Sequence, residues 1–289
     1  MNKLNRQSLI YTLSAVFLWS TVATAFKISL KGMNFAQLLF YASITSTLAL
    51  GIFLFKKKQK FLILNTKLLL LGFLNPFFYY MLLFNAYTLL PAQEAQPLNY
   101  TWPIVLSLFS VLFLKEKMNF KKIVGLISAF VGVLIIATRG NLLELKFGNI
   151  FGVILALSTS VVWATYWILN LKDTESNCVK LFGTFFWGTI FSGMYLLFFD
   201  SFKLDNYRYL FGASYIGLFE MGITFLLWNK GLQLSNDKAK TSTLAYLAPF
   251  LSILFIAFIL GETILPSSIV GLFFIVGGIV YQNFNKTSS

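Results

Sequence analysis

Ten apolar stretches of 17 to 23 residues limit what this chain can fold into. They lie at residues 8–26, 35–55, 68–90, 94–114, 120–138, 149–170, 179–199, 209–230, 240–260 and 267–283. A helix needs roughly 20 mostly apolar residues to cross the hydrocarbon core of a bilayer. Only 11% of the residues are charged, whereas a soluble domain carries about 25%. The sequence therefore predicts an all-α membrane protein with ten transmembrane helices joined by short linkers.

The second constraint is an internal duplication. Landmarks that recur after 146 residues are Pro103 and Pro249, Glu116 and Glu262, and the tetrapeptide Ile-Val-Gly-Leu at 123–126 and 269–272. Nearer the start of each half the spacing is 144 residues, as between Trp19 and Trp163. Each half, residues 1–140 and 149–285, then holds five helices. Because five is an odd number, the two copies cross the membrane in opposite senses. Two inverted five-helix repeats are typical of secondary transporters, with the substrate site near the midplane between the repeats.

The distribution of charge indicates the orientation of the chain. With the N-terminus in the cytoplasm, 17 of the 23 Lys and Arg residues lie on the cytoplasmic side and six on the other. We therefore expect a multi-pass protein of the inner membrane with both termini cytoplasmic. This bias also explains the net charge of +13. No basic stretch has the aromatic interleaving of a nucleic-acid module, so no nucleic-acid partner is expected. We interpret the first stretch as a mature helix, because no small-residue cleavage site follows it.

Residue types that the chain lacks exclude several kinds of chemistry. There is no His, and Cys178 is the single Cys. Imidazole-dependent metal sites and catalytic triads are therefore excluded, and an intramolecular disulfide is impossible. The ten acidic residues are scattered. We expect neither an enzyme nor a cofactor or metal site.

Prolines within the predicted helices are candidate hinges. Pro103 and Pro249 occupy the same place in the two repeats, and Pro76 is a third such proline. A proline inside a helix removes one backbone hydrogen bond, and in a membrane the freed carbonyl needs another partner or lines a cavity. The alternative is a simple kink without a part in motion.

Glu220 is the sharpest single candidate, because it falls near the middle of its predicted helix. An ionised side chain at that depth costs at least about 2.5 kcal/mol. It is predicted to be a proton site or a site for a substrate amine; a neutral Glu bonded to a neighbouring helix is the alternative. Glu94 is a second coupling candidate, and its alternative is an exposed acid in a vestibule. Glu116 and Glu262 are interpreted as helix-end anchors.

Aromatic and polar residues near the centres of the helices are predicted to bind the substrate. The predicted set is Trp19, Tyr79, Asn99, Tyr100, Trp102, Trp163, Tyr166, Glu220, Thr224, Trp228 and Tyr246. Such a lining suits an apolar or aromatic small molecule, or a cation held over ring faces. Interface anchoring is the alternative for aromatic residues in membrane proteins.

Glycines recur on the last helix of each half. Gly125 and Gly132 are seven residues apart, as are Gly271 and Gly278, so each pair lies on one helix face. Small residues let two helix backbones approach closely. These helices are predicted to pack at the repeat interface or in a homodimer contact.

These patterns together resemble a known superfamily. The sequence resembles, in two copies, the EamA-type transporters of the drug/metabolite transporter superfamily. The resemblance rests on the Trp-Ser and Trp-Ala dipeptides, the Pro followed thirteen residues later by Glu, and the Gly-x6-Gly helix. The words at 18–21, 99–103, 163–166 and 228–231, with Glu94, resemble the YddG-type aromatic amino acid exporters. Glu220 departs from that pattern, in which a neutral residue stands.

The resemblance implies a ten-helix basket whose first, third, fourth, sixth, eighth and ninth helices line a central cavity. It also implies alternating access by rocking of the two halves. We expect a carrier of small organic metabolites in the lipid bilayer, chiefly exporting amino acids with aromatic or apolar side chains. The alternatives are an uptake or exchange carrier for a nucleoside-like, sulfonium or amine compound, and a membrane protein that transports nothing.

Overall fold

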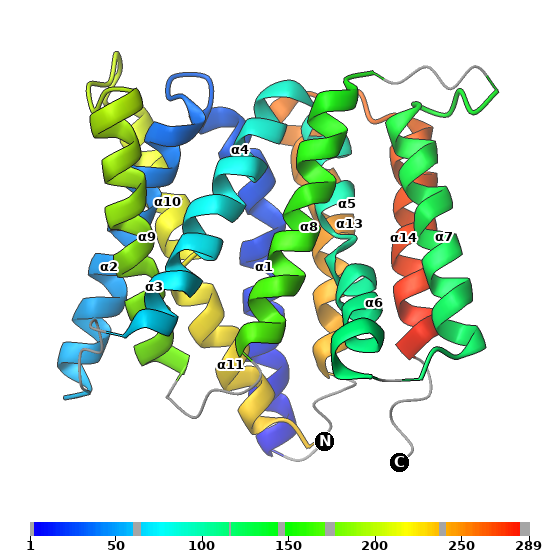
Figure 1. Cartoon of the computed structure of the whole chain (residues 1–289), viewed down its shortest axis with the longest axis horizontal. Helices are drawn as coiled ribbons and strands as arrows, with labels where there is room; N and C mark the ends of the chain where they lie inside the picture. The colour runs from blue at the N-terminus through cyan, green and yellow to red at the C-terminus, as the bar shows by residue number, and fades with distance from the viewer. Residues whose placement is uncertain are drawn as a thin grey trace.

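The computed structural model describes residues 3–59, 65–115, 117–143, 148–170, 177–236 and 241–283. Throughout these ranges the ordered elements are helices, without a strand (Figure 1). Nine helical stretches there are long and apolar enough to cross a membrane, and a tenth apolar helix, Pro266–Gln282, is shorter. Each of the ten corresponds to one stretch expected from the sequence. The predicted fold class is therefore confirmed.

Six of the ten spans are single helices. These are α1 (Lys3–Ser29), α2 (Phe35–Lys56), α7 (Phe120–Ala137), α8 (Ile150–Asn170), α9 (Asn177–Phe199) and α14 (Pro266–Asn283). Each of the other four is built from successive segments. The third span is α3 (Thr66–Gly72), η1 (Phe73–Phe78) and α4 (Tyr79–Leu89), and the fourth is α5 (Ala92–Asn99) and α6 (Trp102–Leu114). The eighth is α10 (Tyr209–Phe219) and α11 (Ile223–Leu234), and the ninth is η2 (Thr243–Leu247), α13 (Ala248–Phe255) and η3 (Ile256–Leu260).

The interrupted spans are the same two in each repeat, and they are interrupted at equivalent positions. The backbone of the third span departs from helical geometry just before Pro76, and α10 of the eighth span ends just before Glu220, 144 residues later. In the fourth and ninth spans, α6 begins at Trp102 and α13 begins at Ala248, 146 residues later. The duplication seen in the sequence is thus also a duplication of backbone shape.

The fourth and ninth spans also end alike. The residues that follow them, Lys115 and Gly261, both have left-handed backbone, with φ of 56° and 68°. This conformation is a common way to end a helix. Glu262 follows the second of these residues. Its counterpart Glu116, predicted as an anchor, lies outside the described residues.

Helix contacts follow the symmetry of two inverted repeats. Equivalent helices pair with each other, α2 with α9 and α7 with α14. Helix α1 of the first repeat packs against α11 and α13 of the second repeat. Its equivalent α8 packs against α4 and α6 of the first repeat, which are the equivalents of α11 and α13. Figure 1 shows α1 and α8 crossing the molecule in opposite directions, with α1 starting on the face where α14 ends.

Glycines bring α7 and α14 into backbone contact. A Cβ placed on Gly132 would lie 2.5 Å from the carbonyl oxygen of Gly271, and one on Gly125 would lie 2.8 Å from that of Gly278. The two predicted glycine faces therefore meet each other within one chain. Of the two predicted roles, packing at the repeat interface is the one seen, and a homodimer is not needed to cover them.

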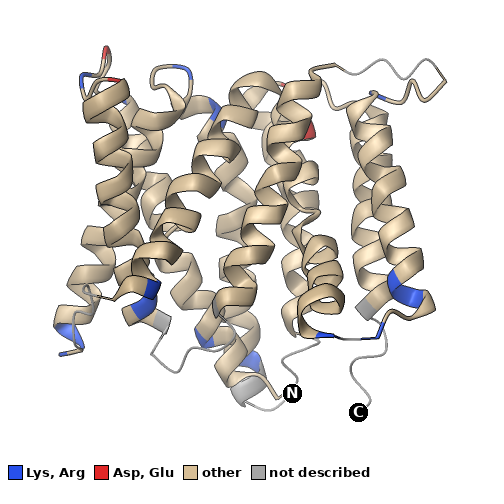
Figure 2. Ribbon diagram, viewed as in Figure 1, with Lys and Arg blue, Asp and Glu red and all other residues tan. Residues whose placement is uncertain are grey.

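Charged side chains are unevenly distributed over the two ends of the bundle. Figure 2 shows Lys and Arg gathered mainly on the face where α1 begins and α14 ends, with few on the opposite face. The Asp and Glu residues that are visible in Figure 2 lie toward this opposite face, where Lys and Arg are few. The described residues thus carry the charge asymmetry expected from the sequence.

Candidate functional site

The interruption of the fourth span is held by the neighbouring helix α8. Pro103 has no backbone N–H, so it cannot donate to the carbonyl of Asn99, four residues earlier. The Ser160 hydroxyl donates to that carbonyl instead, at 3.1 Å. The Asn99 amide donates to the Tyr79 hydroxyl at 3.0 Å and to the Thr159 hydroxyl at 2.8 Å. Pro103 lies in the first turn of α6 and not inside an unbroken helix as predicted, because the span stops before it.

The equivalent interruption in the ninth span lacks the counterparts of Asn99, Thr159 and Ser160. Pro249 again lies in the first turn of its segment, α13. The residue equivalent to Asn99 is Ala245. The residues of α1 equivalent to Thr159 and Ser160 are Ala15 and Val16, both buried and both apolar. The two repeats therefore share a break but differ in the side chains at these three positions.

A continuous group of aromatic rings crosses the centre of the bundle; we call it the aromatic array. It consists of Trp102 of α6, Trp163 and Tyr166 of α8, Tyr79 and Tyr80 of α4, Phe225 and Trp228 of α11, and Trp19 of α1. Phe225 lies between the two repeat-equivalent tryptophans, 5.6 Å from Trp19 and 6.3 Å from Trp163 between ring centroids. The array thus joins five of the six spans expected to line the centre.

Glu220 lies beside this array, at the interruption of the eighth span. The Tyr80 hydroxyl donates to its carboxylate at 3.1 Å. The hydroxyls of Tyr79 and Tyr100 lie within electrostatic range of the same carboxylate. Thr224, in the first turn of α11, is buried and donates its hydroxyl to the carbonyl of Phe219. Side-chain and backbone polar groups are therefore concentrated where α10 ends and α11 begins.

Tyr79 connects the polar and aromatic parts of the site. Its hydroxyl bonds to Asn99, and its ring centroid lies 4.7 Å from that of Tyr80 and 5.0 Å from that of Trp163. Most of the surrounding side chains are partly buried, including Asn99, Trp163 and Glu220. The arrangement offers ring faces for an apolar or aromatic body and one carboxylate for a polar head.

Two predicted residues have other surroundings. Tyr246 packs both against the main apolar core and against the smaller cluster of Ile253, Leu272 and Val276. Glu94 is 1% exposed, and its carboxylate pairs with the Nε of Arg139 at 2.8 Å. The alternative reading of Glu94 as an exposed vestibule acid is therefore wrong, because the ion pair holds its carboxylate among the helix ends.

Glu262 anchors the start of α5. Its two carboxylate oxygens accept the backbone N–H groups of Ala92 at 3.0 Å and Gln93 at 3.3 Å. A carboxylate at a helix N-terminus also interacts favourably with the helix dipole. Beside it is a cleft of about 250 Å³, lined among others by Lys27, Lys31 and Glu262. The Lys27 ammonium donates to the backbone carbonyl of Tyr87 at 2.7 Å, which ties α1 to the end of α4.

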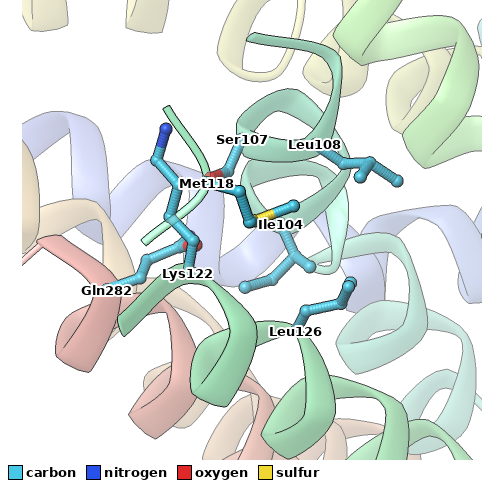
Figure 3. Close-up of a pocket in the computed structure, with 7 residues that line it drawn as sticks. All are labelled: Ile104, Ser107, Leu108, Met118, Lys122, Leu126 and Gln282. Atoms are coloured by element: carbon cyan, nitrogen blue, oxygen red, sulfur yellow. The ribbon is translucent and has the colours of Figure 1, made fainter. Parts of the chain in front are cut away.

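A second hollow lies between α6 and the α7–α14 pair (Figure 3). Its lining residues are Ile104, Ser107, Leu108, Met118, Lys122, Leu126 and Gln282. It has room for about 10 Å³, which is the space of a single water molecule. It is too small for an organic substrate. No group of three or more Cys, Asp or Glu residues suited to a metal ion occurs within the described ranges.

Sequence reasoning missed several residues of the site. Phe225 and Tyr80 adjoin predicted residues, but neither has a repeat partner of the same type that would have singled it out. Thr159 and Ser160 lack counterparts as well. The Asn99 amide has hydrogen-bond partners on α4 and α8, and identifying them required the three-dimensional packing.

Inverted five-helix repeats with interrupted spans meeting at a polar and aromatic centre define the architecture of inverted-repeat membrane carriers. The chain belongs to the EamA-like transporter family, which it matches at residues 6–138 and 150–284. These two matches correspond to the two halves of the fold.

Several relatives are similar to this chain. An uncharacterised transporter of Clostridium kluyveri is 27% identical over 63% of this chain and 60% of its own length. The uncharacterised transporter YvbV of Bacillus subtilis is 29% identical over 67% of this chain and 64% of its own. The aromatic amino acid exporter YddG of Ancylobacter novellus is 23% identical over 62% of each chain. The matched stretches thus span less than two thirds of these relatives.

A solved crystal structure of another protein has the same fold. It superposes with a TM-score of 0.68 over 95% of this chain and 95% of that chain, at 20% sequence identity. At this identity the similarity concerns the fold alone.

Proposed function

We propose that the chain is a secondary transporter of small organic metabolites that works by alternating access. The observation that carries this proposal is the interruption of the same two spans in both repeats, next to one shared aromatic array. Interrupted helices at the interface of inverted repeats expose backbone groups where a substrate binds near the midplane. The membership in the EamA-like transporter family supports the same function.

The substrate class that we propose is an amino acid with an aromatic or apolar side chain, moved out of the cell. The aromatic array provides ring faces for such a side chain, and Asn99 and Glu220 provide the polar groups beside it. The similarity to the Ancylobacter exporter, although distant, supports this choice. The proposal places the chain in the cytoplasmic membrane with both termini in the cytoplasm, on the basis of its charge asymmetry.

Within this proposal Glu220 is the candidate for coupling to a proton gradient. It is an acid at the interruption of a membrane span, and a carboxylate at that depth is stable only when it is paired or protonated. Glu94 is the weaker candidate, since Arg139 already neutralises it. Pro103 and Pro249, at the start of equivalent segments, are proposed as the hinge positions.

The experiment is a flux measurement in proteoliposomes made from the purified protein. We expect saturable exchange of radiolabelled phenylalanine or another apolar metabolite, and a change of rate when an inward or outward pH gradient is imposed. Empty liposomes are the control. Absence of saturable flux for every amino acid, nucleoside and amine tested would defeat the transporter proposal, whereas flux indifferent to pH would remove only the coupling.

A further inference from the structure

The Glu220 carboxylate has no cationic partner among the side chains that the structure describes. The ion pair seen in those ranges joins Arg139 to Glu94, far along the chain from Glu220. The side-chain hydrogen bond that Glu220 receives comes from the neutral hydroxyl of Tyr80. The other ionisable groups that interact with it electrostatically are the phenols of Tyr79, Tyr87 and Tyr100. No described Lys or Arg balances the charge of this carboxylate.

An unbalanced carboxylate within a membrane span is unfavourable, because the surroundings cannot replace the water that solvates the charge. Its charge has to be balanced from solution, either by a proton or by a bound cation. Glu220 lies at the break between α10 and α11 and is partly exposed. Its carboxylate can therefore take up one positive charge.

The aromatic array beside Glu220 suits a cation with an apolar body. Ring faces attract cations and also pack against aromatic or aliphatic groups. The Tyr79 ring adjoins both the Tyr80 ring, whose hydroxyl touches Glu220, and the Trp163 ring. Tyr79 and Tyr80 are themselves buried, so it is the partly exposed Trp163 ring that can receive the body of a small amine whose ammonium faces the carboxylate.

A carboxylate on the substrate finds less support in the same place. Both N–H groups of the Asn99 amide are already donated, to Tyr79 and Thr159. The start of α11 offers backbone N–H groups, but it follows Glu220 by three residues, so a second carboxylate there would approach a like charge. The two lysines near Glu262 belong to a different cleft.

We propose that Glu220 binds the ammonium group of the transported molecule, so that the site prefers monoamine cations with an aromatic or apolar body over the amino acids with the same side chain. The inference rests on the proposed transporter function and replaces the amino acid named there, as the preferred substrate, by an amine with the same side chain. A substrate ammonium and a proton would then exclude each other from one carboxylate.

Three probes that share a phenyl group test this preference: phenethylamine, which is a cation, phenylalanine, which is a zwitterion, and phenylacetate, which is an anion. Binding is measured by quenching of tryptophan fluorescence in detergent, and flux is measured in proteoliposomes. We expect phenethylamine to bind and move best and phenylacetate worst. In Glu220→Gln the affinity for phenethylamine should fall about 10- to 100-fold, the range of a charge-assisted hydrogen bond.

Two further variants complete the design. Asp205→Asn removes an exposed carboxylate far from the site and should leave the order of the probes and their affinities unchanged. Glu220→Asp keeps the charge and should keep the order. If Glu220→Gln does not fold, the order of the three probes with the unaltered protein still decides the question.

The outcomes separate the inference from the function on which it rests. Preference for phenylalanine over phenethylamine, or equal affinities in the unaltered protein and Glu220→Gln, overturns the inference and leaves the transporter intact. Binding in the expected order without any flux supports the site and contradicts transport. If no probe binds and none is transported, the inference is overturned, and the transporter function is then decided by the wider screen of amino acids, nucleosides and amines.

Discussion

At the scale of single residues, the missing backbone N–H of Pro103 determines the hydrogen bonds around the break in the fourth span. Pro103 leaves the carbonyl of Asn99 without its helical partner, and Ser160 of α8 supplies a hydroxyl. The Asn99 side chain then reaches Tyr79, which adjoins the aromatic array. A proline that could be read from the sequence thus determines where three helices exchange hydrogen bonds.

Trp163 is the member of the aromatic array with the most ring neighbours. Its centroid lies within 6.4 Å of the rings of Trp102, Tyr79, Tyr166 and Phe225. Trp163→Ala removes the ring that connects α4 and α6 to α11, so the substrate loses stacking surface. We expect the apparent affinity to fall at least about tenfold, because an aromatic contact is worth about 0.5–1.5 kcal/mol beyond burial and several are lost together.

Trp167 of the same helix provides a matched control. It is 39% exposed on the surface of the bundle. Trp167→Ala should leave the KM for the transported substrate within about twofold, since surface substitutions change stability by about 0.5 kcal/mol or less. Equal effects of the two substitutions on KM would show that Trp163 acts through folding and not through binding.

At the scale of helices, the sequence predicted the number and type of elements but not their interruptions. Hydropathy depends on composition, and an interrupted span is as apolar as a straight one. Prolines indicated places of weakness in the third, fourth and ninth spans. The eighth span breaks between Glu220 and Gly222 without any proline, so nothing in the hydropathy pattern marked it.

The glycine contact between α7 and α14 gives a prediction about stability. Gly132→Ala places a methyl group 2.5 Å from the carbonyl oxygen of Gly271, so the two helices have to move apart. Overpacking of this kind costs about 1–3 kcal/mol. We expect a lower free energy of unfolding, measured by titrating the purified protein in micelles with SDS.

Gly277 on α14 is the control for this effect. A Cβ there would meet no atom within 4 Å, so Gly277→Ala should be neutral or slightly stabilising. The stabilisation expected from helix propensity is at most about 1 kcal/mol. If Gly132→Ala proves as stable as Gly277→Ala, the close contact of α7 and α14 does not hold the repeats together.

At the scale of the whole molecule, the duplication made the architecture predictable and the site only partly so. A constant spacing revealed the paired prolines and tryptophans, and their geometry follows the symmetry of the fold. Phe225, Thr159 and Ser160 have no counterpart of the same type, so symmetry could not reveal them. The candidate site includes residues in which the repeats differ, and only their packing shows which of them meet.

The orientation of the molecule follows from its charges and can be tested by labelling. The face where α1 begins carries most of the described Lys and Arg side chains (Figure 2), which favours the cytoplasmic side. Gln59 follows α2 on that face, and Tyr207 precedes α10 on the opposite one; both are exposed. Cys178, the single native Cys, is buried and can be replaced by Ser for the background.

In that background we expect Tyr207→Cys to react with a membrane-impermeant maleimide in intact cells, and Gln59→Cys to react only after the membrane is permeabilised. Neither substitution changes the net charge, so the charge bias that sets the orientation is preserved. Retained flux of each variant shows that the fold is intact. The opposite labelling pattern would place both termini outside the cell and contradict the proposed orientation.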